Sequence, residues 1–213
     1  MKQYPSILHD IYLNRYAYAF DKLDGSNVRF EWSKKGGWYK FGTRRTMIRE
    51  DDPLFGKAIN IFMDKYGEDL ERVFRNNKLY RNTNNFIVYG EFFGENSFAG
   101  QHKEGDKMDV VLFDVNQYKK GFIKPNEFIK NFGHLHIPEL IYQGNITETF
   151  IKSIRNNEYD LVEGVVVKGT RPSKNADHIW MSKIKTTEWL EAVRKKFGEK
   201  ALIEEFKGSN IML

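Results

Sequence analysis

The strand-like segments of the sequence and the helical patterns between them predict an α+β fold. Segments rich in aromatic and β-branched residues recur along the chain, whereas residues 55–74 repeat apolar side chains at helical spacing. The 213 residues contain no internal repeat, long linker or low-complexity stretch. We therefore expect a single domain over residues 1–213.

The first part of the chain is expected to be mainly strands. Aromatic and aliphatic residues predict strands over residues 16–20, 28–32 and 38–41. Gly36-Gly37 is expected to turn the chain between the last two. Asp21-Lys22-Leu23-Asp24-Gly25 separates the first two and predicts a tight turn with Lys22 at its entrance. An ordinary hairpin with an Asp-Gly turn is the alternative explanation of this stretch.

The helices and remaining strands follow from capping signals and apolar runs. Asp51-Asp52-Pro53 has the composition of a helix start, and Gly67 is expected to kink or split that helix. Further helices are expected over residues 125–132, from a cap at Thr147 to 155, from Thr186 or Thr187 to 197, and over 199–206. Further strands are expected over residues 86–94, 110–115, 141–142, 161–168 and 179–185.

Composition limits the class of protein. The sequence has no cysteine, which excludes disulfides and thiolate metal sites. It also has no apolar run long enough to span a membrane and no hydrophobic signal segment at its start. We therefore expect a cytoplasmic protein that does not bind membranes. The net charge of +5 and the pI near 9.1 are a mild indication of a polyanionic partner.

Basic residues are concentrated in one stretch, called here the basic segment. It contains six basic residues and no acid: Lys34, Lys35, Lys40, Arg44, Arg45 and Arg49. Trp38, Tyr39 and Phe41 lie among them. Basic side chains interleaved with aromatic rings suit a nucleic-acid backbone. The alternative is a solvated edge hairpin whose lysines discourage aggregation.

Five features that could carry chemistry lie on or beside predicted strands. They are Lys22 with Asp24 and Gly25, Glu91, Phe113 before Asp114, Glu163-Gly164, and the pair Lys183 and Lys185. Each alone has an ordinary explanation as a turn, a salt bridge, a core ring or a solvated face. Glu91 and Glu163, however, interrupt apolar strands, where an unpaired charge costs several kcal/mol. A metal ion or the lysines should compensate them.

In this order, the five features resemble the motifs of the covalent nucleotidyltransferases, which include ATP-dependent DNA ligases, RNA ligases and mRNA capping enzymes. The resemblance covers about residues 17–190. It is strongest to nick-sealing RNA ligases, because Asn27 lies five residues after the lysine, Gly42-Thr43-Arg44-Arg45 resembles their basic motif, and Lys168 lies five residues after Glu163. Only 28 residues follow Lys185, so we expect a minimal form without the second domain of longer relatives.

The resemblance implies an adenylation domain of two mainly antiparallel β-sheets with flanking helices. It also implies that Lys22 attacks the α-phosphorus of ATP to form a lysyl-AMP, from which AMP passes to a nucleic-acid 5′-phosphate before a 3′-hydroxyl displaces it. Attack needs the neutral amine. The positive charges of Lys183, Lys185 and a bound Mg²⁺ could favour that form.

The family's roles carry over to single residues of this chain. Glu163 would hold Mg²⁺ or Mn²⁺, with Asp24 acting through the metal's water shell. Glu91 would contact the ribose and Phe113 would stack on adenine. The remaining implied contacts are Lys183 and Lys185 with phosphate oxygens, Asp21, Lys168 and Arg44 with adenine, phosphate and ribose edges, Gly25 within the nucleotide-binding motif, and Asn27 with the 5′-phosphate or metal waters.

Other functions remain open from the sequence. A minimal ATP-dependent DNA ligase would differ only in its substrate, and a capping guanylyltransferase would normally need a second domain. A non-catalytic module that binds nucleic-acid ends would explain the basic segment, yet would not require the five features together. An unrelated β-rich binding protein would make them coincidental. For the ligase we expect a monomer acting on a nicked duplex or RNA ends, with an accessory protein as one way to grip the duplex, as in a phage-type repair enzyme.

Overall fold

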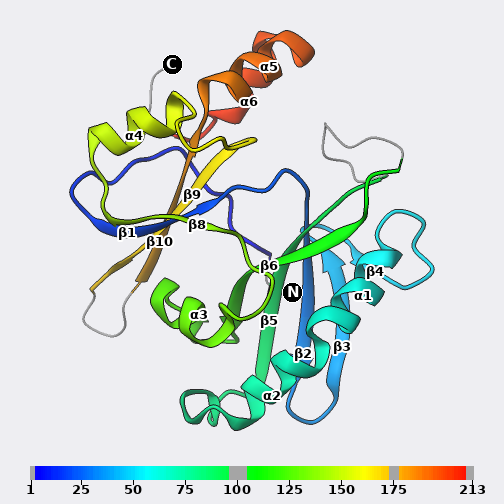
Figure 1. Ribbon diagram of the computed structural model, residues 1–213. Helices are drawn as coiled ribbons and strands as arrows, with labels where there is room; N and C mark the ends of the chain where they lie inside the picture. Colours follow the sequence, from blue (N-terminus) through cyan, green and yellow to red (C-terminus); the bar gives the residue numbers. More distant parts are fainter. Residues whose placement is uncertain (1–2, 96–104, 173–177, 210–213) are drawn as a thin grey trace. The chain divides into compact units, whose positions relative to one another are not determined.

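The computed structural model describes residues 3–95, 105–172 and 178–209 (Figure 1). They form two compact units, one of Met1–Tyr4 and Asp24–Ile137, the other of Pro5–Leu23 and Pro138–Leu213. Each unit has its own antiparallel sheet, and the helices pack on these sheets. The α+β class with two antiparallel sheets is therefore confirmed, whereas the single domain stays a prediction. In the described chain, no helix has the length and apolar character needed to cross a membrane.

The first unit contains a six-stranded sheet of order β4-β3-β2-β5-β6-β7. Its strands are β2 (Ser26–Ser33), β3 (Gly37–Thr43), β4 (Met47–Ile48), β5 (Asn85–Phe93), β6 (Asp109–Gln117) and β7 (Gly121–Phe122). Its helices are α1 (Gly56–Phe62), a π-helix (Met63–Gly67), α2 (Glu68–Asn76), a 3₁₀ turn (Lys78–Tyr80) and α3 (Pro125–Phe132).

Alternation along β2 separates a hydrophobic face from a polar one. Val28, Phe30 and Trp32 are buried in the core formed with the helices. The ring of Phe30 stacks on Phe62 of α1 at 3.6 Å between centroids. Fully burying such a side chain contributes about 1.5–3 kcal/mol. The alternate residues of β2, Asn27, Arg29 and Glu31, lie on the opposite face of the sheet.

The second unit contains a four-stranded sheet of order β10-β9-β1-β8. Its strands are β1 (Tyr16–Asp21), β8 (Leu140–Asn145), β9 (Gly164–Arg171) and β10 (His178–Lys185), and its helices are α4 (Glu148–Arg155), α5 (Thr187–Phe197) and α6 (Glu199–Glu205). Phe150 and Ile154 of α4 pack with Ala17, Val165 and Ile184 of the sheet. Because this core covers one face of β1, β9 and β10, only side chains on the other face of these strands can contribute to a binding site.

One alternative is excluded and one local prediction is wrong. The segment around Lys22 is not the alternative hairpin, because β1 pairs with β8 and β9 whereas β2 pairs with β3 and β5. The first helix begins at Gly56 rather than at Asp51–Pro53. Asp52 instead stabilises the preceding turn, where its Oδ1 accepts hydrogen bonds from the backbone N–H groups of Leu54 and Phe55 at 2.9 and 2.8 Å.

Other local predictions are confirmed. Thr147 and Thr186 cap α4 and α5, each accepting a hydrogen bond from the backbone three residues later. The expected interruption at Gly67 is present as the π-helix between α1 and α2. One strand is displaced, since β9 begins at Gly164 and leaves Glu163 just before it rather than within it. Glu163 can therefore point its carboxylate away from the strand pleat.

Candidate active site

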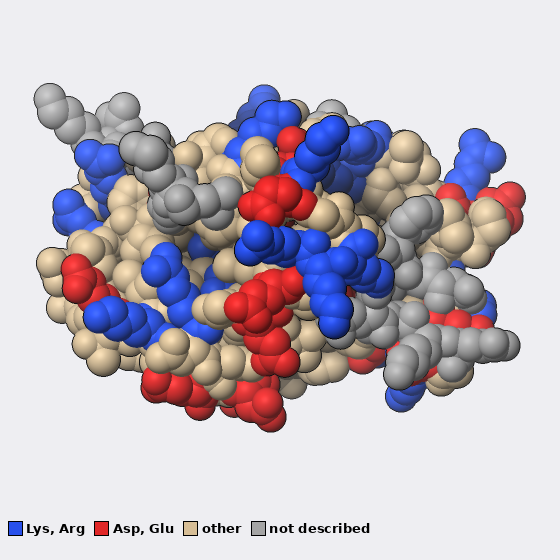
Figure 2. All heavy atoms as spheres, turned by 90° about the horizontal axis from the view of Figure 1, so that it is seen from above, with Lys and Arg blue, Asp and Glu red and all other residues tan. Residues whose placement is uncertain are grey.

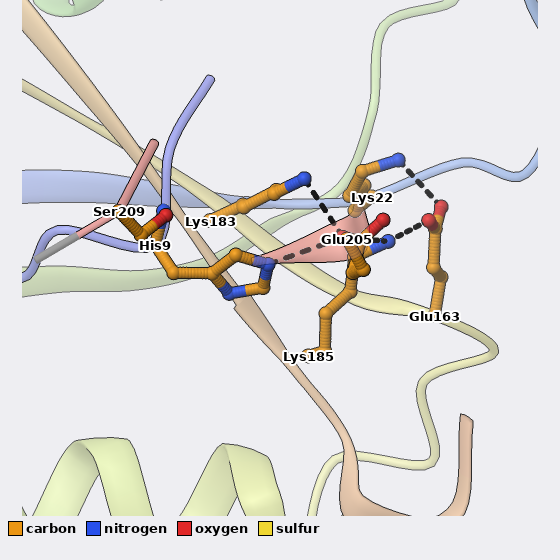
Figure 3. Close-up of polar contacts among 7 residues, drawn as sticks. All are labelled: His9, Lys22, Glu163, Lys183, Lys185, Glu205 and Ser209. Atoms are coloured by element: carbon orange, nitrogen blue, oxygen red, sulfur yellow. Dashed lines mark hydrogen bonds and ion pairs between the residues drawn. The ribbon is translucent and has the colours of Figure 1, made fainter. Parts of the chain in front are cut away.

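Lys22 is held by both its backbone and its side chain. It follows the last residue of β1, and its backbone N–H donates to the carbonyl oxygen of Gly164 at 2.9 Å. Its Nζ donates to Oε2 of Glu163 at 2.6 Å (Figure 3). The Lys22 side chain is 24% exposed, compared with 5% for Glu163. The amine is therefore oriented by a buried carboxylate and is still within reach of a ligand.

Glu163 depends on the glycine after it. Gly164 has φ +140°, and a Cβ at this position would lie 2.1 Å from the carbonyl oxygen of Ile184. Glycine therefore allows β9 to begin directly against β10, where Gly164 is the register partner of Lys185. This pairing brings Lys185 to Glu163, and Lys185 Nζ donates to Oε1 of the carboxylate. The Glu-Gly sequence thus has a steric cause.

Lys183 and Lys185 lie on one face of β10, as the alternation predicted. Ile184 between them is buried in the core. Lys185 is almost fully buried, and its Nζ lies 3.6 Å from the centroid of the Trp189 ring. Lys183 Nζ pairs at 2.7 Å with Oε1 of Glu205, which is the last residue of α6. Lys185, together with Lys22, therefore provides the compensation expected for Glu163. Lys183 instead pairs with the second carboxylate, Glu205, which also lies 3.7 Å from Lys185 Nζ.

Two further candidates belong to the same unit. Lys168 is buried in β9. It lies on the same sheet face as Lys183, because Val166 is the register partner of Lys183 and Val167, between Val166 and Lys168, faces the core. Asp21 ends β1, and its Oδ1 is buried with no hydrogen-bond partner among the described residues. Burial, reinforced by the charge of Glu139, raises the pKa of the Asp21 carboxyl.

The remaining candidates belong to the first unit. Asn27 of β2 is the register partner of Glu91 of β5, and both lie on the polar face of the sheet. Gly25 leaves room for Glu91, since a Cβ there would lie 2.7 Å from Glu91 Cγ. The Oδ1 atom of Asn27 is buried and has no hydrogen-bond partner in the part of the chain that the structure describes. A polar ligand group would satisfy it.

Three further candidate site residues belong to the first unit: Phe113, Arg44 and Asp24. The half-buried ring of Phe113 in β6 contacts Tyr4 edge to face at 5.0 Å between centroids. Arg44 lies in the turn between β3 and β4, where its carbonyl oxygen accepts from Arg29 Nη1 at 3.4 Å. Asp24 is the residue at which the chain passes from the second unit to the first. The Lys-x-Asp-Gly motif thus contributes residues to both units.

The metal prediction depends on Glu163. Among the described residues, no group of three or more His, Asp or Glu side chains could hold a metal ion by itself. However, Mg²⁺ commonly binds one or two carboxylates and completes its coordination with waters and substrate phosphates. Both oxygens of Glu163 already accept from ammonium groups, those of Lys22 and Lys185. The carboxylate is thus a ligand for positively charged groups, and a metal ion shared with the phosphates of a nucleotide would have to replace one of the two ammonium groups on it.

The sequence did not indicate His9 or Glu205 as part of this cluster. His9 reaches it because Leu8 forms a parallel bridge with Ser182, and Lys183 N–H donates to the Leu8 carbonyl at 3.0 Å. His9 Nε2 lies 3.1 Å from Oε1 of Glu205. Neither residue belongs to a motif, so no local signal could have revealed them.

The comparisons with known proteins identify the family of this chain. Residues 15–185 match the family model for RNA ligases, so the chain belongs to the RNA ligase family. This membership confirms the resemblance to the nucleotidyltransferases that include the ATP-dependent ligases. A search of curated protein sequences found no match.

Solved structures show a similar fold. An archaeal ATP-dependent RNA ligase matches with a TM-score of 0.63 at 16% identity, covering 95% of this chain and 56% of that one. The Naegleria gruberi RNA ligase with PPi matches with a TM-score of 0.59 at 16% identity, covering 91% and 60%. A Naegleria gruberi variant with ATP and Mn gives 0.59 at 17%, covering 86% and 53%. The chain therefore spans little more than half the length of these relatives.

Proposed function

We propose that this chain carries out the adenylation chemistry of an ATP-dependent RNA ligase. The observation that carries the proposal is the contact of Lys22 with Glu163, a carboxylate that Lys185 also binds. A partly exposed amine held beside a buried carboxylate and further lysines suits a nucleophile that attacks a phosphate. The similar Naegleria gruberi structures hold ATP and Mn, AMP and Mn, or PPi, which supports ATP and a divalent ion as the ligands.

In the proposed reaction, the Lys22 amine loses a proton and forms a P–N bond to the α-phosphorus of ATP, while the α–β phosphoanhydride bond breaks and pyrophosphate leaves. AMP then passes to a nucleic-acid 5′-phosphate, and a 3′-hydroxyl displaces it to form the phosphodiester. Each step is an in-line displacement, so the protein contributes mainly positioning and charge neutralisation.

The residues of this chain have distinct proposed tasks. Lys22 is oriented by its backbone bond to Gly164, and Lys183 and Lys185 bind phosphate oxygens. Glu163 would hold Mg²⁺ or Mn²⁺, with Asp24 acting through water, and the bound ion would supply positive charge at the phosphates.

The nucleotide and strand contacts are proposed from the family resemblance. Glu91 and Phe113 would contact the ribose and adenine, and Asn27 the 5′-phosphate. Asp21, Lys168 and Arg44 would add contacts at the nucleotide edges. The unpartnered Oδ1 atoms of Asp21 and Asn27 support ligand roles for both, because buried acceptors normally have partners.

Intact-protein mass spectrometry after incubation with ATP and Mg²⁺ tests the proposal, with GTP in parallel. We expect one AMP per chain, mapped to Lys22, and none in Lys22→Ala. The matched control is Lys152→Ala, which removes an exposed lysine of α4 and should label normally. Retained labelling of Lys22→Ala would reject this nucleophile, and a GMP adduct would indicate capping chemistry. Protein already adenylated on purification would be identified by release of ATP with pyrophosphate.

Sealing at nicks in RNA is the finer part of the proposal. The direct test is to seal duplexes in which each side of the nick is RNA or DNA in all four combinations. Preference for RNA at the 3′-hydroxyl side would support an RNA ligase. Equal or better sealing of all-DNA nicks would favour the minimal DNA ligase.

A further inference from the structure

Helices α5 and α6 are attached to the second unit with little apolar burial. Neither helix contains a buried residue, whereas α4 of the same unit buries Phe150, Ile151 and Ile154. Two large apolar side chains of the pair are well exposed, Phe197 at 60% and Ile203 at 57%. Since helices in proteins are stabilised mainly by packing of an apolar face, polar contacts must hold this pair to an unusual extent.

Those polar contacts converge on Glu205 (Figure 3). One oxygen, Oε1, lies 2.7 Å from Lys183 Nζ, 3.1 Å from His9 Nε2 and 3.7 Å from Lys185 Nζ. Burial alone would raise the pKa of Glu205, but the hydrogen bond from His9 and the charges of Lys185 and Lys183 outweigh it and lower the pKa to about 2. Glu205 is therefore an anion at neutral pH.

His9 completes the surroundings of this anion. Its ring is buried, and burial lowers its pKa. Because an ionised carboxylate can only accept, Nε2 is the donor in the 3.1 Å contact with Glu205. The ring also stacks on Phe206 at 4.1 Å between centroids, and its backbone N–H donates to Ser209 Oγ at 3.0 Å. Two ammonium groups and one imidazole N–H thus surround a single oxygen anion.

This donor set is equally suited to phosphate, because charge-assisted hydrogen bonds from lysine serve carboxylates and phosphates alike. Two of the three donors are the lysines to which the proposed function assigns phosphate oxygens. A polyphosphate and the Glu205 carboxylate cannot both occupy the position beside Lys183 Nζ. Binding of one must weaken binding of the other by the same factor.

We propose that Glu205 is an internal competitor for a polyphosphate site formed by Lys183, Lys185 and His9, and that a bound pyrophosphate group displaces it and loosens α6. The inference rests on the proposed function for the two lysines and adds His9 as an anion-binding residue. Since neither helix has a fully buried residue, loss of this one carboxylate contact should weaken the attachment of α6.

The test is calorimetric titration of pyrophosphate into the wild-type chain, Glu205→Gln and Glu204→Gln. Glutamine keeps the shape and hydrogen bonds of Glu205 but removes its charge. We expect Glu205→Gln to bind pyrophosphate about tenfold more tightly, within the usual range of coupling between sites. Glu204→Gln removes the same charge from a neighbouring residue that is exposed and pairs with Lys207, so its affinity should equal that of the wild type. Unchanged or weaker binding by Glu205→Gln, or no binding by any chain, would overturn the proposal.

Hydrogen exchange on the wild-type chain supplies a readout that needs no variant. Saturating pyrophosphate should accelerate exchange of the α6 amides, while those of α4 stay unchanged. Unaltered protection of α6 would reject displacement. The AMP-labelling assay above separates this inference from the proposed function. Normal labelling without any effect of Glu205→Gln rejects the competitor alone, whereas tighter pyrophosphate binding without labelling rejects only the ligase chemistry.

Discussion

At Glu163, one carboxylate pairs with two ammonium groups, Lys22 on one oxygen and Lys185 on the other. The sequence showed that an acid in an apolar run needs a cation, and it provided candidate lysines. It could not show that one carboxylate would serve both, because that arrangement depends on the register of β9 and β10. Removing one member of a buried pair is costly because the other charge remains, whereas removing both is often nearly neutral.

We therefore expect Glu163→Gln to lower the free energy of unfolding by about 3–5 kcal/mol. The double variant Glu163→Gln with Lys185→Met should recover part of this loss, because it removes the buried ammonium group as well. Urea unfolding of both variants at pH 7 measures the difference. If the double variant is less stable than Glu163→Gln, the loss in Glu163→Gln does not come from the buried Lys185 ammonium group left without its partner.

The ionised form of Asp21 is disfavoured in the folded chain, since its pKa is raised by burial and by the nearby Glu139. A carboxyl whose pKa is higher in the folded than in the unfolded chain destabilises the fold when it is ionised. Asp21→Asn should therefore raise the free energy of unfolding at pH 7. This gain in unfolding free energy should be complete above the pKa of Asp21 in the folded chain. It should vanish as the pH falls below the pKa of an aspartate in the unfolded chain, near 3.8.

Thermal or urea unfolding of Asp21→Asn and the wild type across this pH range is the measurement. If Asp21 also binds the nucleotide as proposed, the variant should be more stable and yet bind ATP more weakly. A variant that is less stable at pH 7 would contradict the sign of the shift.

Among the elements, strands and helices were predicted well wherever a local pattern determines them. Helix α3 agrees with its predicted bounds, and Thr147 and Thr186 are the caps of α4 and α5. The alternative of a hairpin at Lys22 could not be excluded from the sequence, because alternation reveals a strand without revealing its partners. The start at Asp51 failed because the same acidic residues that cap helices also stabilise turns.

The junction of β9 and β10 is the element on which the candidate site depends most. Gly164→Ala would place a methyl group against the Ile184 carbonyl at a positive φ, so we expect a loss of about 3 kcal/mol or more in unfolding free energy and impaired AMP labelling. Gly37→Ala is the control, because Gly37 has φ +66° but no atom within 4 Å of its added Cβ. It should cost about 1–2 kcal/mol and leave labelling intact. Equal losses would show that strain alone, rather than the close approach of β10, accounts for the effect.

For the whole molecule, charge determines how a polyanion is attracted. The net charge is only +5, and the face in Figure 2 shows Lys and Arg side chains interspersed with Asp and Glu rather than one continuous positive field. Attraction must then come from local groups, and the basic segment is the strongest such group in the sequence. Arg45 of this segment is exposed in the turn between β3 and β4.

If Arg45 contacts a phosphate, Arg45→Ala should weaken binding to a nicked RNA duplex and reduce the slope of log affinity against log salt by about 1. Lys152→Ala, which removes one exposed charge outside the basic segment, should leave the slope unchanged. The measurement is a binding isotherm at several salt concentrations. Equal slopes for Arg45→Ala and the wild type would exclude this phosphate contact.

The order of strands in the second unit has a consequence for biosynthesis. Strand β1 lies inside its sheet between β9 and β8, and Tyr16 pairs with Asn145. A ribosome that adds about 5–20 residues per second leaves β1 without either neighbour for roughly ten seconds, while the whole of Asp24–Ile137 emerges and can fold. During this interval the nascent chain exposes an aromatic strand with two open edges. The first unit should therefore fold early, and the unit that contains Lys22 should be the one that needs a chaperone.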